Sequence, residues 1–169
     1  MQADLRQAGV TLPNGTYLYT ALVHSHRSAG HTSRNKTIAA FLGLKRVIQA
    51  PLLMGRNTGH ISRTYFAGVV LPRDVLRRHT LFGYLHLARN EADAHEREEL
   101  LIHGSKQKGY LIGSEGAKDP RWCKRCADDE LERFGVANWK TIHQLESVRI
   151  CHIHGDPLLV RCKGCGITP

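Results

Sequence analysis

Apolar side chains recur every three to four residues through the first two thirds of the chain, which is the spacing of one helix face. One such stripe lies in residues 17–25 and a second lies in residues 33–43, where Gly43 stands at a position that commonly ends a helix. The candidate N-caps are Asn14 or Thr16 for the first helix and Ser33 for the second. Two short helices joined by a Gly-containing turn predict either a helix-turn-helix or a plain helical hairpin.

Two further helices are expected before residue 104. One begins near Asp74, its candidate N-cap, and carries an apolar stripe within residues 81–85. The other runs from about Ala92 to His103 and ends at Gly104. These segments predict a helical, helix-turn-helix-like domain over residues 1–104.

The following segment, residues 105–119, is the predicted linker, because it carries several glycines with Lys and Ser between them. A second unit is then expected over residues 120–169. Its pattern predicts a short helix over residues 128–134 and a strand over residues 148–150. Trp122 and Trp139 are expected to pack over the zinc module as its small core.

All five cysteines lie in this second unit. Cys123 and Cys126 form a CxxC pair, Cys151 and His154 form a CxxH pair, and 24 residues separate the two pairs. An odd number of cysteines and no apolar signal core at the N-terminus argue against a disulfide framework. Two turns that each present two soft ligands satisfy tetrahedral Zn²⁺, and four protein ligands leave no open position for water. The pattern therefore predicts a structural zinc site and a mainly α fold with a C-terminal zinc-finger module.

Cys162 and Cys165 form a second CxxC pair, after which no further cysteine follows. This pair is a possible second zinc half-site, completed by a histidine, by another chain or not at all. His152, between two expected ligands, is expected to be a solvent-facing neighbour of the first site.

Composition narrows the class of protein. Of the 169 residues, 41% are hydrophobic and 23% charged, as in ordinary globular proteins, and no apolar run approaches the roughly 20 residues of a membrane span. The formal net charge of +9 favours anionic partners, with nucleic acid first. The candidate DNA-binding residues around the first two helices are Arg34, Lys36, Lys45 and Arg46.

The ligand motifs belong to a longer pattern. It comprises Trp122-Cys-Lys-Arg-Cys126, Phe134-Gly135, Trp139, His143-Gln-Leu145 and Val148-Arg-Ile-Cys-His-Ile-His154-Gly155, preceded upstream by Arg78-His-Thr-Leu-Phe-Gly-Tyr84. With these motifs in this order, the chain resembles the TniQ/TnsD family of transposon target-selection proteins. It departs from the family pattern at Glu146-Ser147, where Pro-Gly is usual.

The resemblance implies a non-catalytic adaptor in DNA transposition. One face would contact target DNA or an RNA-guided CRISPR effector complex, and another would recruit an AAA+ ATPase regulator similar to TnsC. It also implies a cytoplasmic, nucleoid-associated prokaryotic protein with no membrane partner, and leaves dimerisation open.

Two alternatives remain at the level of sequence. One is a zinc-stapled HNH-type nuclease, with His152 as the base and Asp156 as a Mg²⁺ ligand; its zinc would be held by Cys123, Cys126, Cys162 and Cys165. The other is a zinc-containing helix-turn-helix regulator that binds a defined operator and needs no ATPase.

Overall fold

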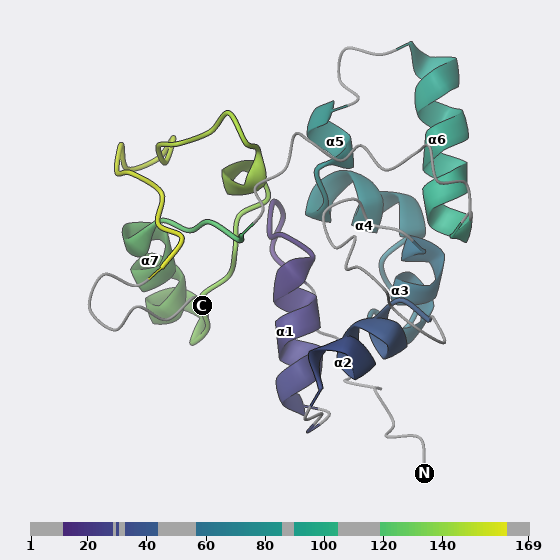
Figure 1. Ribbon diagram of the computed structural model, residues 1–169, viewed down its shortest axis with the longest axis horizontal. Coiled ribbons are helices and arrows are strands. Elements are labelled where there is room, and N and C mark those ends of the chain that lie inside the picture. The colour runs from purple at the N-terminus through teal and green to yellow at the C-terminus, as the bar shows by residue number, and fades with distance from the viewer. Residues whose placement is uncertain are drawn as a thin grey trace.

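The protein is mainly helical. The structure, a computed structural model, describes residues 12–28, 30, 33–43, 57–85, 90–104 and 119–161 (Figure 1). In these ranges the helices are α1 (Tyr19–Ser28), α2 (Arg34–Phe41), α3 (Thr58–Thr64), α4 (Pro72–His79), α5 (Phe82–Leu85), α6 (Glu91–His103), α7 (Lys124–Phe134) and the 3-10 helix η3 (Ile142–Gln144). The extended pairings within the same ranges are isolated bridges, Thr16 with Lys140, Trp122 with Leu159 and Ile150 with Pro157. None of the described helices combines the length and the apolar character needed to cross a membrane.

The helix ends that rest on glycine were predicted correctly. Gly43, Gly104 and Gly135 follow α2, α6 and α7, and each has a positive φ that glycine adopts without a steric penalty. At the start of α6, the side chain of Asn90 accepts a hydrogen bond from the amide of Asp93 at 2.9 Å. This bond satisfies one of the free N–H groups of the first turn.

Two of the expected helix starts are wrong, and the third is confirmed. The first helix begins at Tyr19, so neither Asn14 nor Thr16 caps it, and Thr16 instead pairs with Lys140. In α4 the N-cap position belongs to Leu71, because Pro72 occupies the first turn and places Asp74 inside the helix. Ser33 does occupy the N-cap position of α2, but its hydroxyl makes no capping bond.

In the second unit, α7 is longer than expected and begins directly after Cys123 rather than near residue 128. The strand expected over residues 148–150 is absent from the described chain, where Ile150 makes only a single bridge with Pro157. One isolated pair is too short to form a ladder.

Two apolar clusters fill the helical part. The larger joins α1, α2 and α3 to the start of α4 and contains Leu12, Leu18, Ala21, Leu22, Ile38, Phe41, Leu42, Ile61, Tyr65, Phe66 and Val75. The smaller lies between α4, α5 and α6 and contains Leu76, Phe82, Leu101 and Ile102. The members of the larger cluster on and beside α1 and α2 lie within the stripes that helical spacing predicted over residues 17–25 and 33–43.

The α4–α6 contact also contains a buried carboxylate. Glu98 of α6 has a fully buried side chain. Its carboxylate forms ion pairs with Nε of Arg77 at 2.7 Å and with Nε of Arg73 at 3.1 Å. Both arginines belong to α4, and their outer parts remain half-exposed. A charge removed from water in this way requires such partners.

Residues 119–161 contact the chain around the start of α1. The amide of Tyr17 donates to the carbonyl of Trp139 at 2.6 Å, and the amide of Thr141 donates to the carbonyl of Gly15 at 2.8 Å. The Trp139 ring packs edge-on against Tyr19, with centroids 5.1 Å apart. Trp139 thus makes an aromatic contact with α1, which the sequence did not predict. In Figure 1, α1 stands between α7 and the other labelled helices.

Glu130 of α7 organises the segment that makes this contact. Its buried carboxylate accepts a hydrogen bond from the amide of Asn138 at 2.7 Å and pairs with the ammonium group of Lys140. The carboxylate therefore fixes the chain on both sides of Trp139.

Candidate metal centre

The sequence brings two ligands to each of two backbone turns. Cys123 is the N-cap residue of α7 and Cys126 lies in its first turn, so the start of the helix sets the spacing of the CxxC pair. Cys151 and His154 lie in a turn closed by a hydrogen bond from the amide of Gly155 to the carbonyl of Cys151, at 2.9 Å. Gly155 has a φ of 69°, which permits this turn.

A short backbone pairing holds the two turns side by side. Trp122 and Leu159 exchange two hydrogen bonds, of 3.0 and 2.8 Å, directly before the CxxC pair and after the CxxH turn. The amide of Cys151 also donates to the carbonyl of Asp156 at 2.8 Å. Both pairs of ligands are therefore positioned by main-chain geometry.

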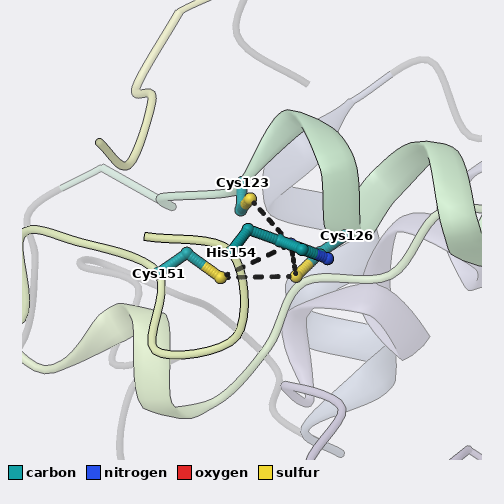
Figure 2. A group of neighbouring side chains, drawn as sticks. All are labelled: Cys123, Cys126, Cys151 and His154. Atoms are coloured by element: carbon teal, nitrogen blue, oxygen red, sulfur yellow. Dashed lines mark hydrogen bonds between the residues drawn. The ribbon is translucent and has the colours of Figure 1, made fainter. Parts of the chain in front are cut away.

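Cys123, Cys126, Cys151 and His154 converge on one point, and we call them the four-ligand cluster (Figure 2). Sγ of Cys126 lies 3.6 Å from Sγ of Cys151. Nδ1 of His154 lies 3.5, 3.4 and 3.8 Å from the sulfur atoms of Cys123, Cys126 and Cys151. Two sulfur ligands of a tetrahedral zinc ion are about 3.8 Å apart when the Zn–S bond is about 2.3 Å, so these separations fit one such ion.

The surroundings shift the pKa values of Cys126 and Cys151 in opposite directions. Burial, together with the neighbouring thiols, raises the pKa of Cys126 above its ordinary range. Burial also acts to raise the pKa of Cys151, but hydrogen bonds from the backbone N–H groups of His154 and Ile153 lower it on balance. Metal ligation needs thiolates, so binding at this cluster would release protons and depend on pH.

A carboxylate outside the four-ligand cluster orients its imidazole. Oδ2 of Asp129, on α7, lies 3.2 Å from Nε2 of His154. The carboxylate accepts the Nε2 proton, which leaves Nδ1 unprotonated on the side of the sulfur atoms. Sequence reasoning did not assign Asp129 this contact.

Arg121 and Gln144 shape the chain between η3 and the CxxH turn. The guanidinium group of Arg121 donates to the carbonyls of Leu145 and, at 2.8 Å, Val148. The Gln144 side chain accepts from the amide of Arg121 at 2.9 Å and donates to its carbonyl at 2.7 Å. Sequence reasoning missed both roles, although Gln144 lies in the His-Gln-Leu motif.

A second group of ligand atoms lies beside the first. His143, Cys151 and His152 each place one ligand atom within 4.8 Å of the others, and we call them the three-ligand cluster. His152 is exposed, as predicted, whereas His143 is buried. Burial first, and then the positive charge of neighbouring groups, lowers the pKa of His143 to about 4. Its imidazole is therefore neutral at physiological pH.

The other candidate residues are only partly described. Cys162 and Cys165 lie outside the described residues, as do Lys45 and Arg46. Lys36 is exposed on α2, and Arg34 is the first residue of that helix.

The nuclease alternative requires a different grouping of zinc ligands. It leaves Cys151 and His154 free, but the structure places both of them against Cys123 and Cys126. The described geometry therefore matches the CxxC and CxxH pairing instead.

Comparison with known proteins agrees with the resemblance found in the sequence. No curated protein matches the chain. A family model with the description TniQ matches residues 25–158, which includes the helical part from the last turn of α1 onward and all members of the four-ligand cluster. Membership of this family implies a transposition-associated adaptor role. Because the match covers most of the chain, the protein belongs to the TniQ family.

Proposed function

We propose that the chain is a non-catalytic adaptor that links target recognition in DNA transposition to an AAA+ ATPase regulator similar to TnsC. The target would be recognised as DNA or through an RNA-guided CRISPR effector complex. The observation that carries the proposal is the family match over residues 25–158.

The chemistry of the four-ligand cluster supports a role without catalysis. Three thiolates and one imidazole are the donors that Zn²⁺ prefers, and together they fill its coordination sphere. Zn²⁺ bound there would staple the start of α7 to the CxxH turn and would offer no position for a substrate.

The first experiment is a pull-down of the zinc-loaded chain against an AAA+ ATPase regulator similar to TnsC. The ATPase is offered with ATP and duplex DNA, with ADP and DNA, or with ATP alone. We expect retention that is strongest with ATP and DNA together, because the adaptor would recognise the assembled regulator. Failure to bind under all three conditions, with zinc and helix content intact, would contradict the adaptor proposal.

In this proposal, the helical part over residues 1–104 contacts DNA. Residues 119–161 contain seven basic and seven acidic residues, so the net positive charge of the chain lies outside them. Lys36→Glu, alone and with Lys45→Glu and Arg46→Glu, should weaken binding to nonspecific duplex DNA and reduce its salt dependence. Arg133→Glu is the matched control for the single variant, because Arg133 is exposed on α7 and the charge change is the same. Equal affinity of Lys36→Glu, Arg133→Glu and the unmodified chain at low salt would remove Lys36 from the interface.

The nuclease alternative is tested separately. The zinc-loaded chain with Mg²⁺ should leave supercoiled plasmid intact. Nicking that disappears in His152→Ala would favour the nuclease, because that histidine is its only assigned base.

A further inference from the structure

The three-ligand cluster lies at the inner side of the CxxH turn. His143 comes from η3, whereas Cys151 and His152 are consecutive residues of the turn. Two imidazoles and one thiolate form a donor set suited to Zn²⁺ and other borderline divalent metals. Cys151 is common to this cluster and to the four-ligand cluster.

His143 is the residue whose surroundings most need explanation. Its side chain is 1% exposed, and its Nε2 has no hydrogen-bond partner among the described residues. A buried polar atom left without a partner costs free energy, so such atoms in proteins usually have a role or a bound species. The ring of His152 lies 6.1 Å from that of His143, between centroids, and meets it at an interplanar angle of 65°.

The charge of the first site favours a further cation beside it. A dication with three thiolates and one neutral imidazole carries a net charge of −1. A thiolate that binds one metal ion retains lone pairs, so Cys151 can bridge to a second ion. His152 is exposed and gives that ion a path from solvent.

Neighbouring positive groups limit the affinity. Arg121 and Lys140 act on His143 electrostatically and would repel a second cation. A second ion would also have only three protein ligands, against four at the first site. The second ion should therefore bind after the first and more weakly.

We propose that the chain binds a second divalent metal ion, of the borderline class that includes Zn²⁺, through His143, His152 and the Cys151 thiolate shared with the four-ligand cluster. Solvent occupies the remaining position. This inference requires the first metal site but is independent of the adaptor function.

Native mass spectrometry counts the zinc ions bound per chain as the Zn²⁺ concentration increases. Isothermal titration calorimetry measures the affinity of each binding step. Both measurements use the full chain carrying Cys162→Ser and Cys165→Ser, so that the second CxxC pair cannot bind an ion that would be counted. We expect two ions per chain, in two steps of different affinity. His152→Ala should abolish the second step and leave the first, since His152 is exposed and not a member of the four-ligand cluster.

The matched control is His103→Ala, which removes an exposed histidine from α6, and it should retain both steps. A single zinc ion per chain at saturation would overturn the inference while leaving the first site intact. So would a second step unchanged in His152→Ala. Absence of any bound zinc would instead reject the four-ligand cluster.

Discussion

Asp129 shows how one side chain sets the chemistry of another. Its carboxylate holds Nε2 of His154, so Nδ1 is the nitrogen that faces the three sulfur atoms. The sequence predicted which four residues would come together, because their spacing alone puts two donors on each turn. It could not predict the partner of the imidazole, because α7 carries several acidic residues and nothing in the sequence distinguishes which of them contacts His154.

The first prediction removes that partner. Asp129→Ala should weaken zinc binding by about 10- to 100-fold, because the imidazole loses the group that fixes its orientation and its proton. Competition with a chromophoric chelator measures the change. Asp128→Ala is the matched control, since Asp128 pairs with Lys124 at 2.6 Å and does not contact His154. Equal zinc affinity in the two variants would show that Asp129 does not position His154.

A second prediction concerns pH. His79 is buried, and its Nδ1–H donates to the carbonyl of Thr16 at 2.8 Å. Burial lowers the pKa of His79 despite this bond, so the unfolded chain takes up a proton more readily than the folded one. The contribution of His79 to stability is therefore present above about pH 6.5 and is lost as the pH falls below it.

Urea unfolding of the zinc-loaded chain at pH 7.5 and pH 5.5 measures this effect. Between these values the unmodified chain should lose more stability than His79→Gln, by at most about 1.4 kcal/mol, the linkage of one proton over this range. His103→Gln, at an exposed position, should follow the unmodified chain. A His79→Gln profile parallel to that of the unmodified chain would mean that His79 titrates alike in both states.

At the scale of elements, periodicity predicted α1, α2 and α6 but not α3, and it predicted the helix starts poorly. The single helix expected from near Asp74 through residues 81–85 is two helices, α4 and α5, because the chain is extended at Thr80. The stripes of α1 and α2 and the glycines after α2, α6 and α7 are local signals, and the structure confirms them. The start at Asp74 is wrong because Pro72 fits the first turn of a helix better than its interior. The contact of α4 with α6 through Glu98 could not be predicted, because the charged residues of a helix give no sign of which one is buried.

The third prediction tests that contact. Arg73→Ala with Arg77→Ala leaves the Glu98 carboxylate buried without either arginine, and should reduce the free energy of unfolding by about 3 to 5 kcal/mol. Adding Glu98→Gln should restore much of this loss, because a neutral amide costs less to bury than a charge. Urea titration gives all three values.

Arg78→Ala is the control on the same helix. Arg78 forms an exposed pair with Asp74, and its loss should change stability by less than about 1 kcal/mol. If the double arginine variant is no less stable than Arg78→Ala, the α4–α6 ion pairs are not what holds these helices together.

For the whole molecule, the sequence predicted two units but not the contact between residues 119–161 and α1. Composition predicts a linker over residues 105–119, which lies outside the described residues except for Asp119. The pairing of Thr16 with Lys140 joins residues more than a hundred positions apart and leaves no local pattern. The described part of the small unit has little apolar core beyond the metal ligands, with Leu158 packed beside three of them. Metal binding should therefore supply part of its folding free energy.

The fourth prediction follows from this dependence. Cys151→Ser, or removal of zinc by a chelator, should unfold residues 120–169 and spare the helices before them. Hydrogen exchange should show loss of protection at the amides of Tyr17 and Thr141, which bond across the contact, and continued protection in α3 and α4. Retained zinc together with a single cooperative melt in Cys151→Ser would refute the prediction.

The four-residue interval between Cys126 and Glu130 has a consequence for how this protein can vary in evolution. Cys126 belongs to the four-ligand cluster, Glu130 fixes the chain around Trp139, and both lie on the same face of α7. Inserting or deleting one residue between them would rotate one relative to the other by about 100° and separate the two tasks. Natural relatives should therefore keep the length of this interval unchanged and accept insertions after the helix, near the exposed Gly135.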